Sequence, residues 1–90
     1  MNEVKINLPF LIAAIETLDG ILHIEQRDGN FDQSTRVYQK RDKFLETITL
    51  SGLHYKFRAR DDFQWLEILK QECDMVTILV IVVIRANWVD

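Results

Sequence analysis

The chain has 90 residues, of which 48% are hydrophobic and 28% are charged, and its formal net charge is −3. This composition excludes a disordered or low-complexity protein and predicts a single α+β domain over residues 1–90. A lone cysteine, Cys73, excludes an internal disulfide. Because the chain has no CxxC motif and no Cys/His cluster, we expect no zinc site, and we expect no cofactor. The single cysteine also favours a reducing compartment, so we expect the protein in the cytoplasm.

Two apolar segments raise the question of a membrane partner. The run from Met75 to Ile84 has only ten residues, about half of what a membrane-spanning helix needs. The segment 8–15 is followed by Glu16 and Asp19, where a signal peptide would carry small residues. We therefore expect a soluble protein without a signal peptide and without a membrane partner.

The first third of the chain predicts a helix and a strand. Alternation over residues 1–8 is weak and leaves a short first strand undecided. Asn7 is a suitable N-cap and Pro9 fits a first helical turn, so a helix is expected from Pro9 to Leu18, ended by Asp19 and Gly20. Residues 21–26 alternate between apolar and polar side chains, which predicts a strand, and the turn residues 28–30 would fold the next segment back on it.

Residues 33–50 fit two patterns. Val37, Phe44, Leu45 and Ile48 follow a helical spacing, but Arg41 falls within that apolar stripe. Two strands, over residues 34–41 and 44–50, are therefore favoured over one helix.

The last forty residues predict strand, helix and strand. Residues 53–60 alternate cleanly, Asp61 and Gln64 resemble a capping box for a helix over 61–72, and the β-branched run 75–84 predicts a strand. Strand, helix and strand in succession suggest a βαβ unit with parallel strands. The expected fold is helix, antiparallel meander of three to four strands, helix and a C-terminal strand buried on both faces; a ferredoxin-like βαββαβ order is the alternative.

The C-terminal strand predicts self-association. Both of its faces are apolar, so a strand covered by helices on one side would leave the other side bare. A second copy is the simplest cover, and we expect a homodimer rather than a monomer that the helices close on both sides. The interface candidates are Val76, Ile78, Val80, Val82, Ile84 and Trp88.

The middle of the chain is basic. Residues 33–60 carry seven basic and two acidic side chains, whereas each flanking third carries two basic and six acidic ones. An anion or nucleic-acid site is one interpretation and a solvated face is the other. Tyr55 and Phe57 fall on the strand face opposite the charges, which disfavours base stacking. The candidates are Arg36, Lys40, Arg41, Lys43, His54, Lys56, Arg58 and Arg60.

Catalytic signals are weak. His23, Ser51, His54 and Cys73 lie in no recognisable nucleophile or metal motif. The function expected is that of a non-enzymatic protein-interaction module, a homodimer that inhibits or escorts another protein in the manner of an immunity protein or a chaperone. The alternative is a nucleic-acid-binding module that uses residues 36–60.

Overall fold

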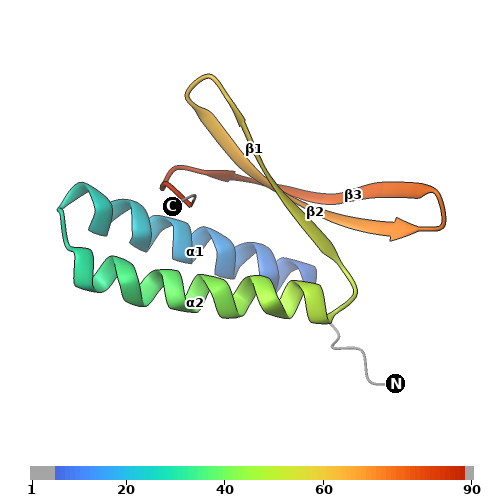
Figure 1. The fold of residues 1–90 in the computed structure, drawn as a ribbon, viewed down its shortest axis with the longest axis horizontal. Coiled ribbons are helices and arrows are strands. Elements are labelled where there is room, and N and C mark those ends of the chain that lie inside the picture. Colours follow the sequence, from blue (N-terminus) through green and yellow to red (C-terminus); the bar gives the residue numbers. More distant parts are fainter. Residues whose placement is uncertain (1–5, 89–90) are drawn as a thin grey trace.

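The computed structural model describes residues 6–88, which form two helices followed by three strands (Figure 1). The elements are α1 (Leu8–Arg27), α2 (Phe31–Leu50), β1 (His54–Arg60), β2 (Phe63–Glu72) and β3 (Met75–Ile84). The helices form one layer, and the strands form an antiparallel meander in the order β1-β2-β3. The α+β class, the strand over 54–60 and the bounds of the last strand are confirmed. The possible first strand falls largely on residues 1–5, outside the described residues.

Helix α1 begins where the sequence predicts but ends later. Asn7 is its N-cap, and the Asn7 side chain accepts a hydrogen bond of 3.2 Å from the backbone N–H of Phe10. The helix then continues through Gly20 to Arg27, so the strand predicted over residues 21–26 is wrong. One glycine inside a helix costs only about 1 kcal/mol, and the buried Leu22 extends the apolar stripe of Leu11 and Ile15.

Residues 31–50 form one helix, so the two strands predicted there are wrong. The Asn30 side chain caps α2 by accepting from the backbone N–H of Gln33. The residues that α2 buries follow the spacing of three and four expected of one helical face. They are Ser34, Val37, Arg41, Leu45 and Ile48.

Residues 63–72 form a strand rather than the predicted helix. Asp61 and Asp62 make the tight turn between β1 and β2 instead of capping a helix. All three strands are antiparallel neighbours, so the parallel βαβ unit and the ferredoxin-like alternative are also wrong. The error has a physical cause: β2 carries apolar side chains on both faces, and their combined spacing imitates a helical stripe.

Both turns of the meander begin with a residue in the left-handed region, Asp61 at φ 56° and Cys73 at φ 53°. A side chain with a Cβ atom is strained there, whereas glycine is not. Cys73 is exposed in its turn and not buried at the end of a helix. We expect Cys73→Gly to raise the free energy of unfolding by about 0.5–1 kcal/mol. Cys73→Ala keeps the Cβ atom and should change little; equal effects of the two in urea unfolding would contradict the explanation.

The core lies between the helical layer and the sheet. Its buried side chains come from both helices, from β2 and β3 and from the segment after β3, and Trp88 is only 3% exposed. The core members are Leu11, Ile15, Leu22, Val37, Leu45, Ile48, Leu66, Ile68, Val82, Ile84, Ala86 and Trp88. Within residues 6–88 no helix is long and apolar enough to cross a membrane.

Strand β3 is not buried on both faces in this single chain, contrary to the sequence-based prediction. In its second half, Val82 and Ile84 are buried against the helices while Ile81 and Val83 are about half exposed. In its first half, residues 75–78 are all exposed, because the β2–β3 turn extends beyond the helices (Figure 1). The helices therefore cover one face of the second half of β3 and leave its other face, and the whole first half, exposed.

A β-bulge divides β3 into two regular halves. Ile68 of β2 lies opposite Val80, and the next β2 residue, Leu69, lies opposite Ile78, so Leu79 is the extra residue. Such a bulge shifts the in-and-out alternation of the strand by one position. As a result, Val76 and Ile78 lie on the same face of the sheet as Ile81 and Val83.

Candidate functional site

The helices leave the other face of the sheet uncovered. Residues directly opposite each other in antiparallel strands share a face, so the strand register defines this surface, which we call the outer face. Each strand contributes a distinct chemical type. The outer face consists of His54, Lys56, Arg58 and Arg60 from β1, Phe63, Trp65, Glu67, Leu69 and Gln71 from β2, and Val76, Ile78, Ile81 and Val83 from β3.

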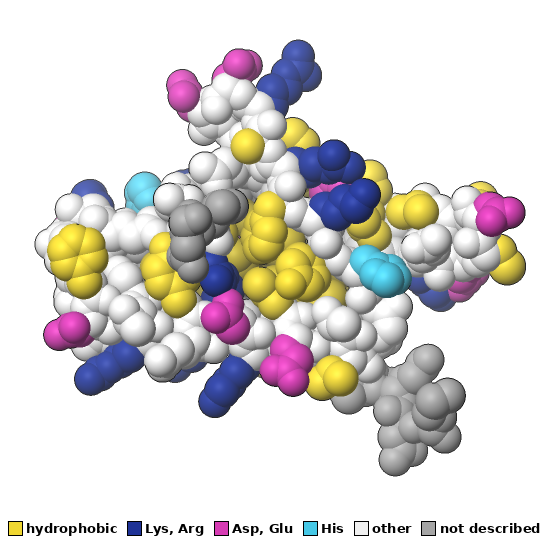
Figure 2. Space-filling model, in the orientation of Figure 1, with side chains coloured by type: hydrophobic (Ala, Val, Ile, Leu, Met, Phe, Trp, Pro, Cys, Tyr) yellow, Lys and Arg dark blue, Asp and Glu magenta, His cyan; other side chains and the backbone are white. Residues whose placement is uncertain are grey.

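The basic candidates of the sequence divide between two places. The four on β1 lie in one exposed row, as their alternation predicts, with Tyr55 and Phe57 turned toward the core. Figure 2 shows a side of the molecule where hydrophobic side chains gather between the helices and the sheet, with Lys and Arg side chains over the sheet beside them. The remaining candidates lie on α2 in the helical layer, where Arg36, Lys40 and Lys43 are exposed and Arg41 is buried. They do not extend the β1 row.

Glu67 lies in the middle of the outer face and is only 8% exposed. Its carboxylate accepts hydrogen bonds from the indole Nε1 of Trp65 at 3.0 Å and from Nε of Arg58 at 3.3 Å. The Trp65 hydrogen bond, followed by the hydrogen bond and charge of Arg58, lowers the pKa of Glu67 below its ordinary value of 4.5. Arg58 is thereby paired with a carboxylate, while the exposed Lys56 and Arg60 form no ion pair within the described residues.

This network predicts a measurable titration. A lowered pKa means that the contribution of Glu67 to stability is present at neutral pH and is lost as the pH falls through its folded-state pKa. In a carboxyl-carbon NMR titration, Glu67 should have a midpoint below 4.5. Trp65→Phe should move that midpoint upward. Glu72, whose pKa is lowered by Lys70 instead, is the internal control, and its titration midpoint should be the same in the wild type and in Trp65→Phe. An unchanged Glu67 midpoint in Trp65→Phe would exclude the indole contact.

Two aromatic side chains accompany the basic row. Phe63 lies opposite Arg60 and Trp65 lies opposite Arg58, and the two rings are 5.7 Å apart between centroids. With Arg60, Asp61, Glu67 and Ile81 they line an open groove of about 540 Å³. Sequence reasoning missed this pairing of charge with aromatic surface because it placed residues 61–72 on a helix.

The apolar interface candidates are also divided. Val76 and Ile78 are exposed on the outer face, 59% and 51% respectively. Val80 points inward and packs against the core, and Val82, Ile84 and Trp88 belong to the core of the monomer. Two exposed residues of β3 that lie on the outer face were not among the candidates: Ile81 and Val83, which the bulge at Leu79 turns outward.

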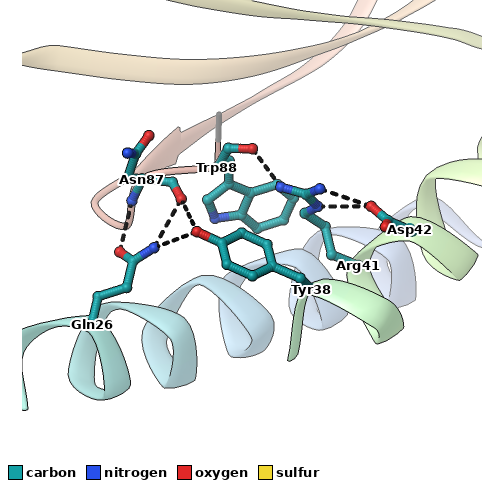
Figure 3. A network of polar contacts seen from close by, with 6 residues as sticks. All are labelled: Gln26, Tyr38, Arg41, Asp42, Asn87 and Trp88. Atoms are coloured by element: carbon teal, nitrogen blue, oxygen red, sulfur yellow. Dashed lines mark hydrogen bonds and ion pairs between the residues drawn. The ribbon is translucent and has the colours of Figure 1, made fainter. Parts of the chain in front are cut away.

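A buried polar network fixes the segment after β3 to both helices. The carboxylate of Asp19, on α1, accepts from the backbone N–H groups of Arg85 and Ala86 and from the indole of Trp88, at 2.9 to 3.2 Å. On α2, Arg41 donates to the backbone oxygen of Trp88 and its guanidinium lies 4.7 Å from the ring centre of Tyr38 (Figure 3).

The network continues toward the helix ends. Gln26 and Tyr38 both donate to the backbone oxygen of Asn87, and the Gln26 side chain accepts from the Asn87 backbone N–H. Within residues 6–88, every buried side-chain nitrogen or oxygen has a hydrogen-bond partner. These polar groups are therefore explained by holding the C-terminal segment in place.

The candidate nucleophiles and bases lie on four different elements. His23 is half-buried on α1, His54 begins β1, and Cys73 is exposed in the β2–β3 turn. The Ser51 hydroxyl, at the end of α2, donates to the backbone oxygen of Ile48. In the part of the chain that the structure describes, no group of three His, Cys, Asp or Glu side chains is placed to hold a metal ion.

Comparison of the chain with protein-family models, with curated proteins and with solved structures finds no match. The functional argument therefore depends on the outer face and on the edges of the sheet.

Proposed function

We propose that the protein is a non-enzymatic interaction module that binds an acidic partner protein through the outer face of its sheet. The observation that supports this is a large uncovered apolar area: Phe63, Ile81 and Val83 are 51%, 54% and 50% exposed. Soluble proteins rarely expose contiguous apolar surface of this kind unless it is an interaction site. Such a module acts by occupying a surface of its partner, as an inhibitor, an immunity protein or a chaperone does.

The chemistry of the outer face defines the partner. Protein interfaces favour an apolar centre that contains aromatic residues, surrounded by a polar rim. Here Phe63, Trp65 and Ile81 supply the centre, and Lys56 and Arg60 form a cationic rim on one side. The complementary surface has an apolar centre with carboxylates on one side. Aliphatic side chains contribute little to binding nucleic acid, so the β3 row favours a protein partner.

The proposal is tested by comparing two variants with the same charge change. Lys56→Glu with Arg60→Glu reverses the rim, and Lys40→Glu with Lys43→Glu makes the same change on α2. Proteins retained from the source cells by the wild type are identified by mass spectrometry, purified and rebound in a titration calorimeter. We expect the rim variant to weaken binding at least tenfold and the α2 variant to leave it unchanged. Equal loss in both variants, or retained proteins without an acidic surface, would contradict the proposal.

A single-stranded nucleic acid is the second candidate. Phe63 and Trp65 lie on the same face as the basic row of β1, which is the arrangement that base stacking beside a phosphate-binding row requires. Fluorescence anisotropy with oligo-dT and oligo-U should then show affinity that falls steeply with salt and is lost in Phe63→Ala with Trp65→Ala. No binding at about 50 mM salt would exclude this candidate.

A further inference from the structure

The two edges of the sheet differ in a way that points to self-association. An edge strand presents unpaired backbone N–H and C=O groups, and natural proteins usually protect such an edge with charges or proline. The β1 edge carries Lys56, Arg58 and Arg60. The β3 edge has ten residues without a charge or a proline, and β2 is its one strand neighbour within residues 6–88. Strand β3 is therefore the edge open to another strand.

The bulge makes β3 complementary to itself. Because of Leu79, the residues on the outer face are Val76 and Ile78 in the first half and Ile81 and Val83 in the second. When two β3 strands lie antiparallel over their full length, Val76 falls opposite the second copy's Val83, and Ile78 opposite the second copy's Ile81. Every outer residue then meets an outer residue, as an antiparallel pair requires. Shifting this register by one residue would oppose outer to inner side chains.

Charges at the two ends of β3 match the same register. Asp74 immediately precedes the strand and Arg85 immediately follows it. Both are exposed, and neither side chain has an ion-pair partner in the described chain. Full-length antiparallel pairing places Asp74 of each copy opposite Arg85 of the other. One two-fold contact therefore contains two opposite-charge pairs.

The structure leaves room beside this edge. A groove of about 370 Å³ is lined by Ile81, Val82 and Val83 of β3, by Arg85, and by Glu16 and Asp19 of α1. An antiparallel second β3 that opposes Val76 to Val83 would have its residues 74–78 beside these β3 residues. Asp19 is already occupied by the backbone that follows β3, so Arg85 and Glu16 are the charged groups available there.

We propose that two copies of the chain associate edge to edge through β3, in the register that opposes Val76 to Val83 and Asp74 to Arg85. The product is a closed two-fold dimer with a continuous six-stranded sheet. It stops at two copies because the remaining edges are the charged β1 strands. The dimer contact is the edge and the proposed partner site is the outer face, so either proposal can fail without the other.

Engineered disulfides test the register. In a Cys73→Ser background, Val76→Cys combined with Val83→Cys should give an intermolecular disulfide under mild oxidation, because opposed Cα atoms lie about 4.5–5.5 Å apart. Neither cysteine alone should cross-link, since each would then be far from its own counterpart in the second copy. Cross-linking of a single-cysteine variant, or none in the double variant, would overturn the register.

Solution mass and a charge exchange test the association itself. Sedimentation of the wild type should give a dimer, and Ile78→Lys should give a monomer while Phe31→Lys, a change at an exposed hydrophobic residue on α2, should not. Asp74→Lys should weaken the dimer about tenfold, and adding Arg85→Glu should restore most of the loss. A wild-type monomer, an open-ended polymer or no recovery in the double variant would each contradict the proposal.

Discussion

An alanine in place of Asp19 is expected to lower the free energy of unfolding by about 3–5 kcal/mol. The Asp19 carboxylate is only 4% exposed and accepts from three N–H groups, those of Arg85, Ala86 and the Trp88 indole. Without it these donors are left without a protein acceptor, and each buried unsatisfied donor costs about 1–3 kcal/mol. The loss is comparable to the whole stability of many small domains.

Urea unfolding of three variants measures this effect. Glu16→Ala removes an exposed carboxylate from the same helix and should change the free energy of unfolding by less than about 0.5 kcal/mol. Asp19→Asn keeps one oxygen acceptor and should fall between the two, which gives a measurable value even if Asp19→Ala does not fold. Equal values for Asp19→Ala and Glu16→Ala would show that the C-terminal segment does not depend on this carboxylate.

Trp88→Ala is expected to lower the free energy of unfolding by about 3–5 kcal/mol, as is usual for a large aromatic residue removed from a core. Trp88 is 3% exposed, and its ring lies 6.1 Å from that of Phe57 between centroids. Its removal opens a cavity at the end of the core and also leaves Asp19 without the indole donor.

The second tryptophan of the chain provides the control. Trp65 is half-buried on the outer face, so Trp65→Ala should cost clearly less than Trp88→Ala in the same unfolding experiment. Tryptophan emission should also separate them, because the protein that retains only Trp88 should emit at shorter wavelength than the one that retains only Trp65. Similar losses of stability in the two variants would contradict the placement of Trp88 in the core.

Local sequence signals predicted the elements that depend on local chemistry. The Asn7 cap fixed the start of α1, and strict alternation identified β1 and the face on which Lys56 and Arg58 lie. The β-branched run gave the bounds of β3. Each of these features is decided by residues within one element, so no information about tertiary partners was needed.

The errors arose where a tertiary partner decides the structure. Arg41 appeared to interrupt the apolar stripe of a helix, but it is buried because the Trp88 backbone oxygen and the ring of Tyr38 receive its guanidinium. Asp19 and Gly20 appeared to end α1, but Asp19 is turned inward by groups 66 to 69 positions later in the chain. No pattern within either helix contains that information.

Only part of the candidate site could be predicted from the sequence. The basic row lies within one strand and was found from its alternation. Phe63 and Trp65 were missed because they lie beside the basic residues only if residues 63–72 form a strand. Ile81 and Val83 were missed because a run of aliphatic residues gives no sign of a β-bulge. Strand pairing, which is non-local, decides both points.

The attachment of the segment after β3 to α1 also bears on how the protein is made. During synthesis the helical hairpin can form as soon as it leaves the ribosome, because its contacts are local. Its apolar side stays uncovered at that stage, since the backbone that Asp19 binds follows all three described strands in the chain. A chain that stopped after Ile84 would therefore contain both described helices and all three described strands, but it would lack the groups that Asp19 and Arg41 bind.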